Sequence, residues 1–222
     1  MDYKRITLFT GHYGSGKTNI AVAYALFLRE MGENVTVADM DIVNPYFRTK
    51  DSAEDFRRHG IELISSEFAN SNVDLPALPS ELYGVVERRE RHAVLDIGGD
   101  DRGAYALGRF APYIREENNY ENLFVANMYR PLTKTPKEAL AVMREIEGAG
   151  GLPITAIVNN SNLGELTDTE TVLASMDYIN ELSRISGLPV KFTSARKDVA
   201  ESLGGMEKGF FPLELQKKIF EI

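Results

Sequence analysis

Short apolar segments alternate with helical patterns along most of the chain. Segments with the apolar character of buried strands fall at residues 5–10, 35–39, 61–64, 93–96, 122–127, 154–159 and 189–193. Helical patterns fall at residues 19–31, 49–60, 81–91, 103–114, 136–147, 167–185 and 213–220. Buried strands that alternate with helices are typical of a parallel sheet covered on both faces. The sequence therefore predicts a three-layer α/β fold with a mostly parallel sheet.

Helix-start signals refine this outline. Pro136 stands near the start of its helix, where its missing N–H is tolerated. Ser80 closes a proline-rich loop at residues 74–80 and is expected to cap the next helix. Thr167 and Glu170 have the spacing of a capping box, which predicts the start of a long helix that runs to residue 185.

A glycine-rich loop joins the first strand to the first helix. It carries the pattern G-x-x-x-x-G-K-[ST] as Gly11-His12-Tyr13-Gly14-Ser15-Gly16-Lys17-Thr18. Between a strand and a helix, the backbone N–H groups of such a loop converge on the α- and β-phosphates of a nucleotide. Lys17 is expected to reach the β- and γ-phosphates, and the Thr18 hydroxyl to ligate Mg²⁺. The loop predicts a binding site for a nucleoside triphosphate.

A carboxylate at the end of an apolar strand is expected to complete the magnesium site. Asp96 directly follows the apolar residues 93–95 and suits this Walker-B role. Gly99 stands three residues further on, where its N–H can approach a γ-phosphate and respond to its loss. The alternative interpretation is that Asp96 only caps a turn at the strand end, and the phosphate loop favours the magnesium role.

Two further carboxylates close the second strand. Asp39 and Asp41 are two residues apart, so they point to the same side while the strand stays extended. The carboxyl ends of parallel strands form the ligand-binding edge of a sheet. Asp41 is therefore expected to position or activate the attacking water, and Asp39 to support the magnesium shell. Two solvated carboxylates in a turn are the alternative.

Polar residues also follow the later strands. Asn159 either reads a purine edge through paired hydrogen bonds or serves as a turn residue. Arg196 and Lys197 either flank the base or are solvated charges, and we favour the second interpretation. Residues 159–162 read Asn-Asn-Ser-Asn, without the Asn-Lys-x-Asp pattern that reads guanine. That difference favours ATP over GTP.

Composition narrows the classes of protein to which the chain can belong. The 222 residues suit one nucleotide-binding domain over residues 1–222, and the net charge of −8 argues against general nucleic-acid binding. The chain has no cysteine, which removes disulfides, thiolate metal sites and iron–sulfur clusters. It has no apolar run of membrane-spanning length and no room for a signal peptide before the first strand, so a cytoplasmic location is expected. For residues 213–220 a core helix is favoured over a membrane anchor.

The order of phosphate loop, paired aspartates and Asp-x-x-Gly resembles the MinD/ParA-like (CobQ/CobB/MinD/ParA) nucleotide-binding domains. The resemblance covers most of the chain and is strongest over residues 5–48 and 93–99. It implies a P-loop NTPase fold with about seven or eight strands. It also implies Mg-ATP hydrolysis and a nucleotide-dependent homodimer whose two subunits meet face to face.

The same resemblance assigns roles to individual residues of this chain. Lys17 and Thr18 match the phosphate and magnesium contacts, Asp41 the catalytic aspartate, and Asp96 the Walker-B aspartate. Asn159 lies, more loosely, where an adenine-reading asparagine is often found.

The phosphate loop departs from the family at its second and third positions. The deviant loop K-G-G-x-G-K-[ST] places there a lysine, which reaches the nucleotide of the partner subunit, and a glycine. This chain has His12 and Tyr13 instead. A neutral imidazole does not replace a permanent ammonium, which puts the lysine mechanism in trans in doubt.

Three functions remain open from the sequence. The leading one is a Mg-ATPase that acts as a nucleotide-dependent switch, read by a second subunit or by an unknown protein partner or cargo. The second is an ATP-dependent metabolic enzyme on the same fold, an amide ligase or a small-molecule kinase of the dethiobiotin-synthetase type. Residues 44–48 and 74–80 would then line its substrate pocket. The third is a nucleotide-binding module with negligible catalysis.

Overall fold

A parallel sheet forms the centre of the computed structural model, which describes residues 3–41, 53–65, 81–99 and 101–214. The eight strands are ordered β3-β2-β4-β1-β5-β6-β7-β8, and every neighbouring pair is parallel. The strands are β1 Ile6–Thr10, β2 Val35–Met40, β3 Glu62–Ser65, β4 His92–Ile97, β5 Tyr120–Ala126, β6 Ala156–Asn159, β7 Val190–Arg196 and β8 Phe210–Leu213. The predicted parallel α/β sheet is confirmed.

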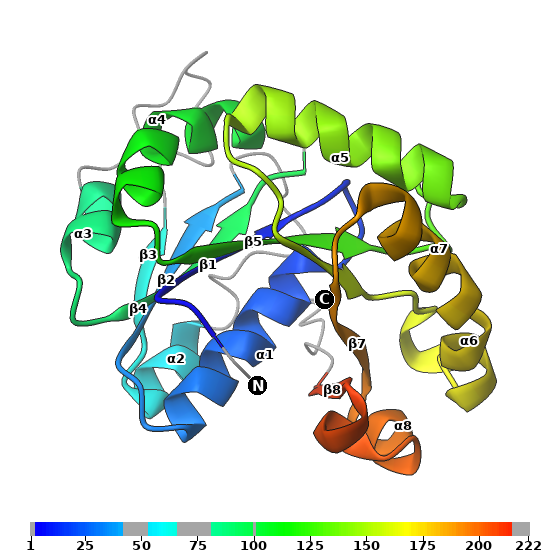
Figure 1. Cartoon of the computed structure of the whole chain (residues 1–222). Helices are drawn as coiled ribbons and strands as arrows, with labels where there is room; N and C mark the ends of the chain where they lie inside the picture. The colour runs from blue at the N-terminus through cyan, green and yellow to red at the C-terminus, as the bar shows by residue number, and fades with distance from the viewer. Residues whose placement is uncertain (1–2, 42–52, 66–80, 100, 215–222) are drawn as a thin grey trace, which may run out of the picture.

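Helices cover both faces of this sheet. In Figure 1, α1 and α2 lie below the sheet, α4 and α5 lie above it, α3 stands at its left-hand end, and α6 and α7 stand at its right-hand end. The α-helices are α1 Lys17–Glu30, α2 Ala53–His59, α3 Glu81–Glu87, α4 Asp101–Glu117, α5 Pro136–Gly150, α6 Thr169–Ala174, α7 Met176–Ser186 and α8 Lys197–Ser202. Two 3₁₀ turns complete the described elements, η3 Gly164–Leu166 and η4 Gly205–Lys208. No helix in these ranges combines the length and apolarity needed to cross a bilayer.

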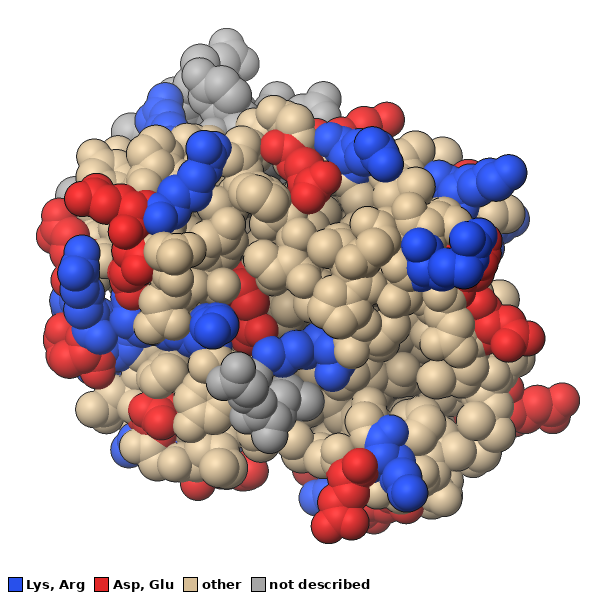
Figure 2. Space-filling view, in the orientation of Figure 1, with Lys and Arg blue, Asp and Glu red and all other residues tan. Residues whose placement is uncertain are grey.

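Charged side chains of both signs are interspersed over the surface seen in Figure 2. Blue Lys and Arg groups lie beside red Asp and Glu groups, and neither sign forms one continuous patch on this face. Along α7, Arg184 pairs with Glu181. Side chains of opposite charge that lie side by side weaken one another's field over this face.

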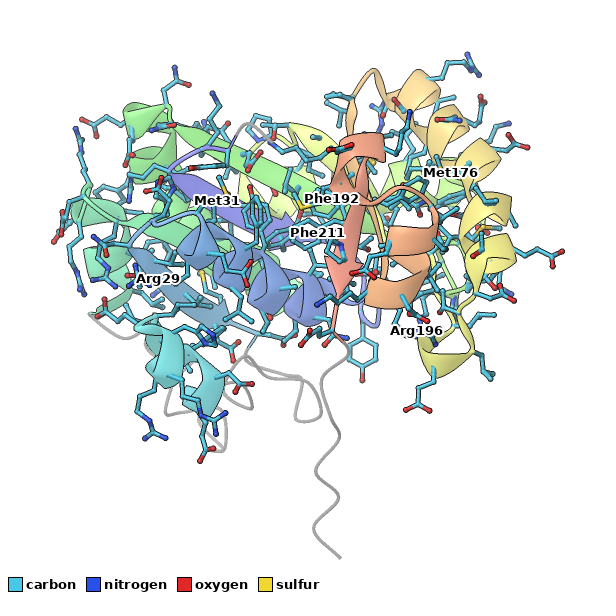
Figure 3. All side chains as sticks on the ribbon, turned by 90° about the horizontal axis from the view of Figure 1, so that it is seen from below. Arg29, Met31, Met176, Phe192, Arg196 and Phe211 are labelled. Carbon is cyan, nitrogen blue, oxygen red and sulfur yellow. The ribbon has the colours of Figure 1, made fainter. Side chains whose placement is uncertain are left out.

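An aromatic cluster packs α1 against the last two strands. Tyr24 and Phe27 of α1 meet Phe192 of β7 and Phe211 of β8, whose rings stack with centroids 4.8 Å apart. Figure 3 shows Phe192 and Phe211 side by side, with Arg196 near α8 at the other end of β7. Burial of each large apolar side chain contributes about 1.5–3 kcal/mol. The cluster thus fixes the helix that follows the phosphate loop.

The predicted continuous helix over residues 167–185 is wrong. Two helices, α6 and α7, meet at Ser175, whose Oγ donates to Val172 O over 2.6 Å. The predicted capping box is also absent, because Asp168 caps α6 by accepting from Thr171 N over 2.8 Å. Thr167 Oγ1 instead accepts from the N–H of Leu163. A carboxylate is a stronger cap than a hydroxyl, and the serine competes with the helix for a carbonyl.

Strand β8 is absent from the sequence prediction, which placed a helix at residues 213–220. Leu213 belongs to β8, and residues 215–220 lie outside the described residues. Pro212 lacks the backbone N–H that a central strand needs. Among the described strands, β8 pairs with β7 alone and stands at the edge of the sheet, where proline is tolerated. The predicted loop at 74–80 and the segment 44–48 also lie outside the described residues.

Candidate functional site

The loop between β1 and α1 has a backbone conformation that its glycines permit. Gly16 has φ 93°, in the left-handed region, and caps the N-terminus of α1. A Cβ at Gly16 would also lie 2.2 Å from Nδ2 of Asn160. Glycine is therefore required there by both backbone and contact. The helix begins directly afterwards at Lys17, and the N-terminus of a helix is a favourable place for an anion.

A cavity of about 310 Å³ opens at the carboxyl ends of the central strands. Its walls come from residues 13–19 of the loop and α1, from Asp41 after β2, and from the turns that follow β5, β6 and β7. The strand order changes direction beside β1, because β2 to β4 lie on one side of β1 and β5 to β8 on the other. Ligands of open α/β sheets bind at this switch point. The volume also suits a small-molecule site.

Lys17 and Thr18 stand at the head of α1 in this cavity. Lys17 is 5% exposed, and its Nζ donates to His12 O over 3.2 Å. Thr18 Oγ1 donates to Oδ2 of Asp96 over 2.6 Å. Asp96 is fully buried near the end of β4, the strand beside β1. The loop therefore places a cation and a hydroxyl–carboxylate pair next to each other.

The two aspartates of β2 have different positions. Asp39 pairs in register with Asp96, so both side chains leave the same face of the sheet. Oδ1 of Asp39 accepts from the backbone N–H of Asp41 over 3.0 Å, which fixes the chain as it leaves the strand. Asp41 borders the cavity, whereas Asp39 does not. The structure thus brings Asp39 beside Asp96 and leaves Asp41 facing the ligand space.

The donor atoms near Thr18 fit a magnesium ion. Thr18 Oγ1 and Asp96 Oδ2 are hard oxygen atoms, and Asp39 lies on the neighbouring strand. Mg²⁺ is usually held by one or two carboxylates together with waters and phosphate oxygens. Within the described ranges, no three His, Cys, Asp or Glu side chains are grouped to hold a metal by themselves. The residues therefore fit an ion that arrives with a triphosphate.

Gly99 contacts the phosphate loop directly. A Cβ at this position would lie 2.7 Å from Tyr13 N and 2.8 Å from Lys17 Nζ. No side chain larger than hydrogen fits without a shift of the loop. The segment after Asp96 thus lies where it can respond to a group bound beside Lys17.

Of the first four residues of the phosphate loop, one packs against the sheet and two border the cavity. Gly11 packs on β5, where a Cβ would lie 2.6 Å from Val125 O. The His12 ring lies 3.0 Å from the carbonyl of Tyr13 and does not border the cavity. Tyr13 and Gly14 do border it, and Tyr13 is 58% exposed. The aromatic residue, and not the histidine, therefore faces the ligand space.

Asn159 does not reach the cavity. It is fully buried, and its Nδ2 donates to Ser175 Oγ over 2.8 Å. The next residue, Asn160, borders the cavity, and its Nδ2 donates to Ser15 O over 2.6 Å. Oδ1 of Asn160 accepts from Ser194 Oγ over 2.7 Å. The structure thus uses Asn159 to join β6 to the α6–α7 junction and brings Asn160 to the phosphate loop.

Arg196 borders the cavity with its charge already paired. Its guanidinium donates two hydrogen bonds to Asp198, at 2.6 and 2.8 Å, and one to Glu165 O at 2.7 Å. The hydrogen bonds from Arg196 lower the pKa of Asp198, and the same pair raises the pKa of Arg196. Lys197 lies outside the cavity and approaches Glu214 at 3.7 Å. Arg196 is thus part of the cavity wall, and its charge is paired with that of Asp198. The sequence favoured a freely solvated charge at this position.

Sequence reasoning missed the part of the cavity wall that follows β5. Asn127 and Arg130 border the cavity from the turn after β5. Asn127 ends the segment predicted as a strand at residues 122–127, so its place at the carboxyl edge of the sheet was a usable signal. Arg130 lies three residues further on and belongs to no recognisable motif.

Comparisons with known proteins identify the fold. No family model and no curated protein matches the sequence. The cell division protein FtsY of Thermotoga maritima superposes with a TM-score of 0.61 at 16% identity, over 86% of this chain and 61% of that one. The signal recognition particle receptor FtsY of Elizabethkingia anophelis, solved with GDP, superposes with a TM-score of 0.55 at 14% identity, over 98% of this chain and 62% of that one.

The signal recognition particle 54 kDa protein of Aeropyrum pernix, also solved with GDP, superposes with a TM-score of 0.52 at 16% identity, over 86% of this chain and 41% of that one. This chain thus spans less than two thirds of the proteins it resembles. Those proteins belong to the signal-recognition branch, so the resemblance to MinD/ParA-like domains is not confirmed. At these identities the likeness establishes an α/β fold of the P-loop NTPase type.

Proposed function

We propose that the chain binds Mg-ATP and hydrolyses it as a nucleotide-dependent switch of the MinD/ParA-like type. The observation that carries this proposal is the 2.6 Å contact between Thr18 Oγ1 and Asp96 Oδ2 at the head of α1, beside the buried Lys17. A phosphate loop needs a cation and a magnesium site at adjacent positions. Lys17 then binds the β- and γ-phosphates, and Thr18 with Asp96 and Asp39 holds Mg²⁺ directly or through water.

Asp41 supplies the remaining group that hydrolysis requires. It borders the cavity on the side of β2, and its backbone is fixed by Asp39. In the proposed reaction its carboxylate orients the attacking water, and Lys17 stabilises the charge on the transferred phosphoryl group. Mg²⁺ supplies charge neutralisation when it is bound.

Adenine is the base that we assign to the site. Guanine presents two N–H donors on one edge, and a carboxylate is the side chain that accepts both. Among the described residues on the cavity wall, Asp41 is the one carboxylate, and it follows β2 rather than the later strands. The carboxylate of Asp198 is already occupied by Arg196. Two of the similar structures were solved with GDP, so the choice of base needs a direct test.

The switch would be read on the segments that touch the γ-phosphate. One of these segments follows β4 and contains Gly99, which lies against Lys17 and Tyr13. The other follows β2 and contains Asp41, which borders the cavity. Contacts made to a γ-phosphate are lost on hydrolysis, which changes the surface around these segments. A second copy of the chain or a protein partner then distinguishes the two states.

Binding and turnover test the proposal directly. We expect Mg-ATP to bind more tightly than Mg-GTP by isothermal titration calorimetry, and Lys17→Ala to weaken ATP binding at least tenfold. Slow ATP turnover without any added substrate is expected, and Asp41→Ala should abolish it while affinity stays nearly unchanged. Absence of nucleotide binding to the wild type would refute the proposal, and tighter GTP binding would refute the choice of base.

Sizing experiments separate the switch from the metabolic enzyme. Asp41→Ala with ATP should elute earlier from a sizing column than the same protein with ADP, if two subunits associate in the triphosphate state. A ligase or a kinase would instead hydrolyse ATP only with its small-molecule acceptor and keep one elution volume.

A further inference from the structure

The turn that follows β5 forms a wall of the cavity for which the proposed function has no role. It comprises residues 127–133, and two of them, Asn127 and Arg130, border the cavity. The turn faces the tip of the phosphate loop, because Arg130 lies beside Gly14. A Cβ built at Gly14 would be 4.0 Å from both Cδ and Nε of Arg130. The arginine therefore approaches the loop from the side opposite to Asp96.

Hydrogen bonds hold this turn in one conformation. Asn127 O accepts from Thr133 Oγ1 over 2.8 Å and from Arg130 N over 3.2 Å. Tyr178 of α7 donates to Thr133 O over 2.8 Å, so a helix anchors the end of the turn. Leu132 has φ 65°, which is unusual for a residue with a branched side chain, and is retained in this anchored turn. The position of Arg130 is thus built into the fold.

The amide of Asn127 points to a missing hydrogen-bond acceptor. Its Oδ1 accepts from Tyr129 N over 3.0 Å, which identifies the other atom as the Nδ2 donor. Asn127 is 1% exposed, and within the described ranges this Nδ2 has no hydrogen-bond partner. A buried donor without an acceptor is unfavourable and rare in folded proteins. On a cavity wall it indicates a ligand that accepts a hydrogen bond.

Arg130 is an exposed cation on this wall. Its guanidinium is exposed and, in the described part of the chain, makes no hydrogen bond or ion pair. Arg196, the other arginine on the wall, is paired with Asp198. His12 does not border the cavity. A guanidinium carries five N–H donors in a planar fork, which suits the oxygens of a phosphate group.

We propose that Arg130 and Asn127 bind the phosphate oxygens of the nucleotide from the β5 side of the phosphate loop. The inference rests on the proposed function and extends its binding site. Lys17 approaches the phosphates from inside the loop, and Arg130 with the Nδ2 donor of Asn127 approaches them across Gly14. Both groups act within one chain, so this contact needs no second subunit.

Arg130→Ala tests the proposal, because an exposed side chain without partners can be removed without loss of the fold. We expect ATP and ADP to bind at least tenfold more weakly by titration calorimetry, since a charge-assisted contact of this kind contributes that much. The salt dependence of binding should also become shallower. Lys134→Ala is the matched control, because Lys134 is an exposed cation four residues along that lies outside the cavity.

Asn127→Asp tests the amide separately. The variant keeps an oxygen for Tyr129 N and replaces the Nδ2 donor by a second oxygen, which repels phosphate. A loss of affinity in Arg130→Ala and Asn127→Asp, with Lys134→Ala unchanged, would support the proposal. Equal affinities of wild type and Arg130→Ala would overturn it while the proposed function stands. A wild type that binds no nucleotide would overturn both.

Discussion

At the scale of single residues, close packing around two glycines decides the shape of the phosphate loop. Gly16 and Gly99 leave no room for a Cβ, the first against Asn160 and the second against Tyr13 N. Lys17 is held by a carbonyl of the same loop. These contacts join residues from β1, β4 and β6 into one rigid surface before any ligand arrives. Preorganisation of this kind lowers the cost of binding.

Gly99→Ala is expected to weaken nucleotide binding strongly. The added methyl group would stand 2.7 Å from Tyr13 N, and because that atom is backbone, the loop has to shift. A displacement of the loop by a few tenths of an ångström disturbs several phosphate contacts at once, so we expect at least a tenfold loss of ATP affinity in titration calorimetry.

Gly148→Ala is the matched control for that experiment. Gly148 lies in α5, and a Cβ there would meet no atom within 4 Å. Alanine in a helix is favoured over glycine by about 0.5–1 kcal/mol. Unchanged ATP affinity and equal or higher stability are expected. If Gly99→Ala also bound ATP normally, the close contact with the loop would have no part in binding.

At the scale of elements, a buried arginine joins α3 and α4 at the start of β1. Arg5 forms an ion pair with Glu117 at the end of α4 and donates to the carbonyls of Val85, Arg88 and Arg91. Arg5→Met should destabilise the fold by about 3–5 kcal/mol, because it leaves the buried carboxylate without its cation. Urea unfolding measures this loss through the midpoint.

An exposed ion pair provides the comparison. Arg184 and Glu181 pair on the surface of α7, with side chains 71% and 46% exposed. Solvent and salt screen such a pair, so Arg184→Ala should leave the urea midpoint unchanged. A similar loss of stability in both variants would show that removal of any arginine charge destabilises the protein, and that the buried contacts of Arg5 have no special part.

Tyr178, which anchors the turn after β5, should make the stability of the protein sensitive to alkaline pH. Burial, and to a smaller extent Glu138, raises the pKa of Tyr178 well above its ordinary value of 10.0. A raised pKa means that the stabilisation is complete below pH 10 and is lost as the pH rises above it, by about 1.4 kcal/mol per pH unit. The hydroxyl donates to Thr133 O, so the ionised form cannot hold the turn.

Tyr178→Phe isolates this contribution. At pH 8 the variant should be less stable by about 1 kcal/mol, the net value of one hydrogen bond. The stability difference between wild type and variant should then shrink between pH 10 and 11, in urea unfolding at each pH. Burial also raises the pKa of Tyr24, which remains in both proteins and cancels in the difference. A constant difference up to pH 11 would contradict the assignment.

At the scale of the whole molecule, sequence was informative where structure is local and weak where it depends on distant contacts. The strand–loop–helix at residues 5–31 and the alternation of strands and helices are short-range patterns, and the fold they predict is confirmed. The choice between Asn159 and Asn160 depends on which way one residue turns at a strand end. The turn that carries Arg130 is held by the hydrogen bond from Thr133 to Asn127 O and by one from Tyr178, 45 residues away in sequence, to Thr133 O.

The final prediction concerns the stability of the whole chain with its ligand. A ligand at 100 times its Kd stabilises a fold by about 2.7 kcal/mol. In a domain of this size each kcal/mol raises Tm by about 2–4 °C, so Mg-ATP should raise Tm by about 5–10 °C. The shift is global because one cavity is bordered by Thr18 at the head of α1 and by residues that follow three different strands, Asp41, Asn127 and Asn160.

Removal of Mg²⁺ separates the metal from the nucleotide in that measurement. With a chelator present, the thermal shift by ATP should fall, because Thr18 and Asp96 then lack the ion that links them to the phosphates. Thr18→Ala should show the same reduced shift with or without Mg²⁺, measured from its own Tm without ligand, which falls because the buried Asp96 loses a hydrogen bond. An equal shift for wild type in Mg²⁺ and in chelator would mean that the hydroxyl–carboxylate pair serves only to hold α1 against β4, and the metal would have to be assigned elsewhere.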